Sequence, residues 1–216
     1  MLQNPPPADS GLAAHERVYR ALRSRIMYGE LDPGIALTIR GVGAEFGVSM
    51  TPAREAVRRL AAEGALSLSA TGRVSTPELT PERIEELAAL RALLEPELAS
   101  RALPRAHMAL IERLRALNAQ VGEHIARRDV SGYIRNNLEF HRALYLRAQA
   151  PAMLAMVETV WLQLGPTMRV LYKERKGSEL QKMHRQILAA LAAGDEPGLR
   201  LAMRTDVTQG LRMLTT

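Results

Sequence analysis

Residues 38–73, with the sequence TIRGVGAEFGVSMTPAREAVRRLAAEGALSLSATGR, decide the fold of the first part of this chain. The stretch begins with an apolar face at Ile39, Val42 and Phe46, whose spacing is that of one side of a helix. Gly47 follows directly, and glycine enters the left-handed conformation that ends many helices without a steric penalty. The pattern therefore predicts a short helix that ends near Phe46.

A second helix is predicted to begin near Met50. Ser49 or Thr51 supplies the hydroxyl oxygen that caps a helix, and Pro52 is tolerated in the first turn, where its missing N–H has no intrahelical partner. The apolar stripe of this helix consists of Ala53, Ala56, Val57, Leu60 and Ala61. The opposite side carries Arg54, Arg58 and Arg59, whose guanidinium groups are suited to phosphates and guanine edges.

A pair of short strands is predicted after this helix. Gly64 breaks the helix, Leu66 and Leu68 alternate with serines, and Val74 resumes the pattern after a glycine-containing tip at residues 70–73. Two crossing helices followed by such a pair form a winged helix-turn-helix, which lays its second helix in the major groove of DNA. The pattern alone leaves an alternative open: packed helices of an all-α protein whose arginines are simply solvated.

The remainder of the chain reads as helical. Thr80 before Pro81 predicts the start of a long helix, and apolar residues then recur at intervals of three and four. Later helices are predicted at Val130–Ala148, Met153–Arg175, Glu179–Ala193 and Glu196–Leu214. We therefore expect a mainly α fold with a winged helix-turn-helix at 12–76, a linker at 77–81, and an antiparallel all-α bundle of about six helices at 82–214. Such a bundle can enclose a ligand cavity.

Charge gives weaker guidance than pattern. The 216 residues include 29 Lys and Arg against 23 Asp and Glu, a formal net charge of +6, which favours a polyanionic partner. Through Leu79, however, there are nine basic and eight acidic side chains, so most of the excess lies in the second part. DNA binding would therefore depend on the direction of individual arginines. These are Arg20, Arg23, Arg25, Arg40, Arg54, Arg58 and Arg59.

The chain contains no cysteine, which excludes disulfides and thiolate metal ligands. No stretch reaches the apolar length that crosses a bilayer. We expect a cytoplasmic protein with no membrane partner and a flexible tail at residues 1–11.

The segment from Ala14 to Thr76 resembles the winged-helix domain of GntR-type bacterial transcription regulators. The resemblance rests on the turn GELDPGIAL at 29–37 and on GVSMTPAREAV at 47–57, followed by Leu60, Gly64 and Leu66. It implies that DNA is contacted by Arg40, Ser49, Met50, Thr51, Arg54, Gly72 and Arg73. Met50 stands where most of the family has arginine, so base preference at that position should differ by about 1–3 kcal/mol.

Polar residues on the later helices form a second group. Asn137 and His141 lie four residues apart on one helix face, and His184 and Asp206 are isolated on the last two helices. Each one alone is more typical of a hydrogen-bonded or surface residue than of a metal ligand. The residues by themselves therefore leave a metal site as the minority interpretation.

Residues 82–212 resemble the all-helical effector domain called FCD that accompanies this winged helix. The resemblance rests on LRALLEPE at 90–97, NLEFHRAL at 137–144 and HRQILAAL at 184–191. It implies a divalent metal such as zinc or nickel, held by Asn137, His141, His184 and Asp206. Two of these four differ from the family's usual aspartate and histidine, so a weakened or metal-free site is the alternative.

Arg91 is the predicted effector-binding residue. Its helix is otherwise apolar on the inward face, so a buried guanidinium there needs an anion. The anion is either an acidic ligand, as the resemblance implies, or Glu95, which lies four residues further along the same helix.

These observations predict a ligand-responsive transcription factor. We expect a homodimer that binds a two-fold symmetric, double-stranded operator, with repression released by a small organic acid. Two alternatives are a small metal-dependent hydrolase-like enzyme, for which no general base is placed by a motif, and a nonspecific architectural DNA binder.

Overall fold

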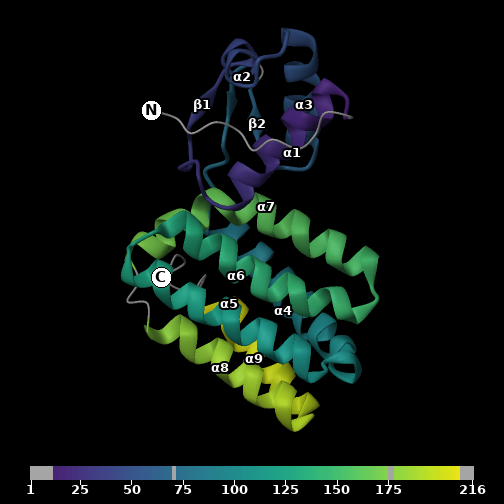
Figure 1. Ribbon diagram of the computed structural model, residues 1–216. Helices are drawn as coiled ribbons and strands as arrows, with labels where there is room; N and C mark the ends of the chain where they lie inside the picture. Colours follow the sequence, from purple (N-terminus) through teal and green to yellow (C-terminus); the bar gives the residue numbers. More distant parts are fainter. Residues whose placement is uncertain (1–11, 70–71, 175–177, 210–216) are drawn as a thin grey trace.

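The computed structural model describes residues 12–69, 72–174 and 178–209. Figure 1 shows a small N-terminal part next to a larger helical bundle. The N-terminal elements are α1 (Ala14–Met27), β1 (Ala36–Leu37), α2 (Ile39–Glu45), α3 (Met50–Ala62), β2 (Ser67–Leu68) and β3 (Val74–Ser75). The mainly α fold with an N-terminal winged helix-turn-helix is therefore confirmed.

The end of α2, the start of α3 and the end of α3 before Gly64 lie where the sequence indicates. The Thr38 hydroxyl caps α2 by accepting a hydrogen bond from the backbone N–H of Gly41 at 2.9 Å. The last helical residue is Glu45, Phe46 is the C-cap, and Gly47 takes a positive φ of 64°, so the chain turns sharply before α3 begins.

The wing has one strand more than the sequence predicts. β3 lies in the centre of a three-stranded antiparallel sheet in the order β1-β3-β2, with both Ala36 and Ser67 opposite Ser75. A two-residue strand such as β1 is too short to show an alternating pattern, so no local signal marked it. Ala70 and Thr71 of the predicted wing tip lie outside the described residues.

The bundle contains, within the described ranges, the six helices expected. They are α4 (Pro81–Ala102), α5 (Met108–Ala126), α6 (Val130–Tyr145), α7 (Pro151–Glu174), α8 (Ser178–Ala193) and α9 (Glu196–Gln209), with short 3-10 turns at Leu103–Arg105 and Leu146–Ala148. Thr80 caps α4 as predicted, by accepting from the backbone N–H of Arg83. The predicted tail at 1–11 and the predicted helix ends at Arg175 and Leu214 lie outside the described residues.

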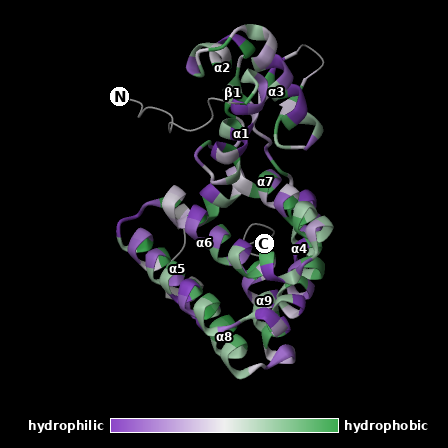
Figure 2. Cartoon of the chain, turned by 45° about the vertical axis from the view of Figure 1, so that its right-hand side comes forward, coloured by the Kyte–Doolittle hydropathy of each residue, from purple (hydrophilic) through white to green (hydrophobic). Residues whose placement is uncertain are grey.

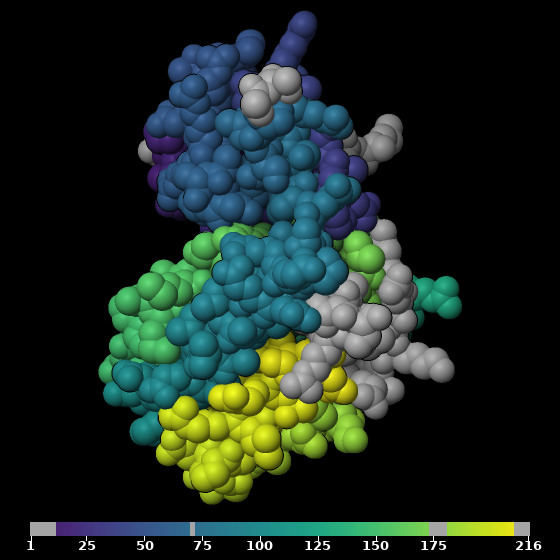
Figure 3. All heavy atoms as spheres, turned by 180° about the vertical axis from the view of Figure 1, so that it is seen from behind, coloured from purple at the N-terminus to yellow at the C-terminus, as the bar shows by residue number. Residues whose placement is uncertain are grey.

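The bundle is assembled around α4. This helix packs against α7 on one side and α9 on the other, and Figure 3 shows it crossing one face of the molecule between them. Hydrophilic and hydrophobic residues follow one another at short intervals along the bundle helices (Figure 2), as in helices with one buried and one exposed face. In the described part of the chain, every helix is too short or too polar to span a bilayer.

Candidate nucleic-acid interface and metal centre

The helix predicted to read DNA is α3. Its buried stripe consists of Ala53, Ala56, Val57 and Leu60, and this face packs against α1. Arg54 and Arg58 are exposed on the other side. The amphipathic pattern therefore places these two guanidinium groups where solvent or a ligand can reach them.

The seven arginines on which DNA binding was expected to depend fall into two groups. Four are ion-paired: Arg20 with Glu16, Arg23 with Glu63 and Glu158, Arg25 with Glu30 and Glu45, and Arg59 with Glu16 and Glu63. The other three, Arg40, Arg54 and Arg58, are exposed and have no ion pair among the residues that the structure describes, and the same holds for Arg73 in the wing. Arg59 is exposed on the outer side of α3 as expected, but it also lies over the Tyr19 ring, 3.6 Å from its centroid, and is therefore engaged within the domain.

The uncharged residues predicted to contact DNA are also accessible. Ser49 occupies the N-cap position of α3 but makes no capping hydrogen bond with its side chain, and both Ser49 and Thr51 are exposed. Met50 is 48% exposed at the start of the same helix. Gly72 has a φ of +79°, and a Cβ there would meet no atom within 4 Å, so the wing backbone is open to a close approach.

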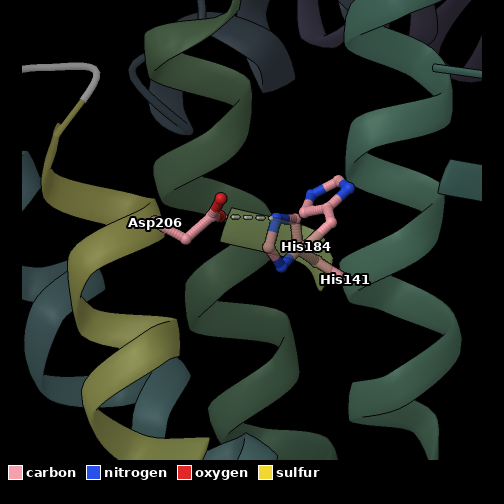
Figure 4. Close-up of side chains that lie close together, drawn as sticks. All are labelled: His141, His184 and Asp206. Atoms are coloured by element: carbon pink, nitrogen blue, oxygen red, sulfur yellow. Dashed lines mark ion pairs between the residues drawn. The ribbon is translucent and has the colours of Figure 1, made fainter. Parts of the chain in front are cut away.

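Three of the four predicted metal ligands lie together inside the bundle. His141 of α6, His184 of α8 and Asp206 of α9 each offer one ligand atom, and these atoms lie within 4.8 Å of one another (Figure 4). Nε2 of His141 is 3.1 Å from Oδ2 of Asp206. Both histidines are buried, and the Asp206 side chain is only 8% exposed.

The hydrogen bonding of this trio is incomplete. Nε2 of both His141 and His184 is buried without a hydrogen-bond partner, and the ion-pair contact of His141 with Asp206 at 3.1 Å is the one close polar contact that either Nε2 atom makes within the described residues. A buried polar atom without a partner costs about 1–3 kcal/mol. A divalent cation would supply the missing partner to both Nε2 atoms and would take the Asp206 carboxylate as a third ligand, so the residues present fit such an ion.

Neighbouring side chains fix the orientation of both rings. Nδ1 of His184 lies 3.1 Å from Oδ1 of Asn118, and the ring stacks on Phe140 with centroids 3.9 Å apart. Nδ1 of His141 lies 3.3 Å from the Tyr145 hydroxyl. Since Nδ1 of each ring is occupied, Nε2 is the nitrogen left for a ligand role. No sequence signal pointed to Asn118, which reaches the site from α5 through helix packing. Tyr145 lies four residues after His141 on α6, and this spacing is the signal that could have found it.

The charge states suit metal ligation. Burial lowers the pKa of His184 to about 4, although the nearby Asp206 carboxylate acts in the opposite direction. Burial alone would raise the pKa of Asp206, but its contact with His141 and the proximity of His184 outweigh burial and lower this pKa. At neutral pH the site therefore offers a neutral His184 ring and a carboxylate, the forms that bind metal.

Asn137, the fourth predicted ligand, faces a cavity. Its side-chain oxygen accepts a hydrogen bond from the Tyr133 hydroxyl at 3.5 Å, and the residue lines a cavity of about 10 Å³. The cavity is also lined by Met27, Arg91, Ile134, Leu138, Trp161, Leu164, Met168 and Tyr172. This volume holds about one water molecule.

Arg91 forms the ion pair that was the alternative to an acidic ligand. Its Nε donates to Glu95, and the same carboxylate accepts from the Tyr145 hydroxyl at 2.8 Å and from Trp161 Nε1 at 3.1 Å. Burial would lower the pKa of Arg91, but Glu95 reverses this and raises it, so the guanidinium stays charged. Arg91 therefore remains a cation in the cavity wall, with one carboxylate already beside it.

Comparison with known proteins agrees with this architecture. Residues 14–74 match the bacterial regulatory proteins of the gntR family, and residues 86–209 match the FCD domain. The HTH-type transcriptional regulator McbR of Escherichia coli strain K12 is 27% identical over 201 residues, which cover 92% of this chain and 91% of McbR. The gluconate operon transcriptional repressor of Bacillus subtilis strain 168 is 30% identical over 152 residues, covering 70% of this chain and 60% of that protein.

Solved structures show the same fold. E. coli McbR superposes with a TM-score of 0.85 at 27% identity, over 94% of this chain and 97% of McbR. A GntR transcriptional regulator of Rhodococcus sp. RHA1 superposes with a TM-score of 0.77 at 21% identity, over 93% of this chain and 96% of that one. These relatives are regulators rather than enzymes. The chain belongs to the GntR family of bacterial, DNA-binding transcription regulators and carries an FCD domain in its second part.

Proposed function

We propose that this regulator is a homodimeric repressor whose affinity for a two-fold symmetric operator falls when a small organic acid binds the bundle. The observation that carries the effector part is the group of polar side chains that converge inside an otherwise apolar bundle. Arg91 and Asn137 line one cavity, and His141, His184 and Asp206 lie together with Nε2 of both histidines lacking a hydrogen-bond partner. Buried polar groups without partners are expected where a ligand supplies them.

A divalent ion, zinc or nickel, would be held by His141, His184 and Asp206. When bound, such an ion provides a Lewis-acid position at which a carboxylate oxygen of the effector can coordinate. Asn118 and Tyr145 hold the two imidazole rings in place for it. An acidic effector would also gain from the charge of Arg91, for which it would compete with Glu95.

On the DNA side, the major groove would be read from the start of α3. Arg54 would contact base edges, Arg40, Ser49 and Thr51 would contact phosphates, and the wing at Gly72 and Arg73 would enter the minor groove. The basis for this assignment is that these arginines are exposed and free of ion pairs within the described residues, whereas most others in this part are paired. Repression is supported by the relative that is named as the repressor of a gluconate operon.

The test is operator binding with and without an organic acid. Fluorescence anisotropy would follow the zinc-loaded protein on the DNA upstream of its own gene, against an excess of random duplex, with gluconate as the first acid added. We expect binding that survives the competitor and weakens at least tenfold with an effective acid. Binding that random duplex abolishes would indicate an architectural DNA binder, and acids without effect across a panel would refute the effector role.

A further inference from the structure

The cavity beside Arg91 is not built from the bundle alone. Met27, the last residue of α1, lines it together with Met168 and Tyr172 of α7 and Leu138 of α6. Met27 is 7% exposed, so its side chain is enclosed there. A residue of the DNA-binding part therefore forms part of the wall of a cavity in the FCD domain.

The end of α1 is seated on α7 at backbone contact distance. A Cβ added to Gly165 of α7 would overlap the carbonyl oxygen of Ile26 and would lie 2.9 Å from that of Met27. Just beyond α1, Arg169 of α7 donates to the carbonyl oxygen of Gly29 at 2.9 Å and to Oδ1 of Asp32 at 2.9 Å. Because main chain packs on main chain here, a displacement of one helix is passed directly to the other.

The size of the cavity decides what occupancy must do. A volume of about 10 Å³ accepts one water molecule, so any larger occupant has to displace part of the wall. Arg91 and Trp161 are held by hydrogen bonds to Glu95, which makes them resistant to displacement. The methionines are unbranched and flexible, so Met27 and Met168 are the wall residues that move most readily.

We propose that Met27 is the residue through which occupancy of the Arg91 cavity is transmitted to the DNA-binding part. An occupant larger than water pushes Met27 and with it the end of α1, and α3 follows because it packs along α1. The inference rests on the proposed function, since it assumes that the cavity admits an effector. Beyond that function, it identifies Met27 as the side chain that links the cavity of the FCD domain to the DNA-binding part.

The test replaces the unidentified effector with a side chain. Leu138→Phe adds bulk to the cavity from α6, and we expect this variant to bind the operator at least tenfold more weakly than the wild type. In the double variant Leu138→Phe, Met27→Ala, the Met27 side chain no longer contacts the added bulk in the cavity. Its operator affinity should return to within about threefold of that of the Met27→Ala single variant. Met203→Ala is the matched control, because Met203 is a buried methionine of α9 outside the cavity lining and should not restore binding.

A second measurement does not require an operator. Amide hydrogen exchange in the last turn of α1 should become faster in Leu138→Phe and return to the wild-type rate in the double variant with Met27→Ala. If Leu138→Phe fails to fold, Leu164→Phe adds bulk to the same cavity from α7. Unchanged operator affinity and exchange in the overpacked variant, or equal rescue by Met203→Ala, would overturn the inference. A wild type that binds no operator, with the exchange result intact, would instead refute the proposed function alone.

Discussion

Ion pairing separates the arginines of the N-terminal part. Arg59 is held between Glu16 and Glu63 over the Tyr19 ring, whereas Arg54, five residues earlier on α3, extends into solvent with no ion pair inside the described ranges. Sequence periodicity put both on the outer side of the helix. It could not separate them, because Glu16 and Tyr19, which engage Arg59, come from α1, and only Glu63 lies close in sequence.

Arg54→Ala should therefore weaken operator binding without unfolding the protein. One lost contact to a base edge is worth about 1–3 kcal/mol, which corresponds to a loss of roughly 5- to 150-fold in affinity. Anisotropy titration at one fixed salt concentration measures the loss. Arg59→Ala is the internal control: it should lower the melting temperature and leave operator affinity within about threefold of the wild type. Equal losses of affinity in both variants would contradict the docking of α3.

The low pKa of His184 makes the stability of the metal-free protein depend on pH. This pKa is about 4 in the folded chain, whereas an unperturbed histidine has a pKa of 6.5, so between these values the unfolded chain binds a proton that the folded chain does not. Acidification therefore lowers the free energy of unfolding, by about 2 kcal/mol between pH 7 and pH 5. Urea unfolding of chelator-treated protein measures this slope. In His184→Leu the free energy of unfolding should depend less on pH, because the contribution of His184 is gone. An identical pH dependence in the variant would show that another group is responsible.

At the scale of elements, most helices and the strand pair β2 and β3 could be predicted, but β1 could not. The end of α2 and the start of α3 follow from Gly47 and the apolar spacing, both of which are local signals. β1 depends on pairing with β3, almost forty residues away, and two residues carry no periodicity of their own. The close approach of α1 to α7 was equally invisible, because Gly165 reads in the sequence only as part of a glycine-proline pair.

Gly165→Ala should disturb the close packing of the end of α1 on α7. The added methyl group would overlap the backbone oxygen of Ile26, which cannot move without shifting α1, so we expect a loss of about 1–3 kcal/mol in the free energy of unfolding. Gly122→Ala in α5 is the matched helical control. There the methyl group meets only the end of the flexible Gln181 side chain, and the better helix propensity of alanine should keep or raise stability. Thermal and urea unfolding of both variants measure the difference, and equal losses would contradict the close seat.

At the scale of the whole molecule, the candidate metal centre draws on three different helices, α6, α8 and α9. The resemblance to the FCD domain identified His141, His184 and Asp206, and the structure brings these three together. The supporting contact from Asn118 had no sequence signal, because it depends on how α5 packs against α8, whereas that from Tyr145 follows its four-residue spacing from His141 along α6. Asn137 illustrates the same limit, since its spacing from His141 could not reveal its contact with Tyr133 or its place in the cavity wall.

Zinc should tie these helices together, because a single ion would join α6, α8 and α9. A ligand that binds only the folded state at one hundred times its Kd adds about 2.7 kcal/mol of stability. For a chain of this length the melting temperature should rise by roughly 5–10 °C. Amide exchange in α8 and α9 should slow at the same time, since unfolding of either helix would release a ligand. Asp206→Asn keeps the shape of the side chain but removes its charge and should abolish both effects, whereas His107→Ala, which removes an exposed histidine outside the trio, should retain them. Stabilisation by zinc that persists in Asp206→Asn would place the ion elsewhere on the protein and remove the trio from the mechanism.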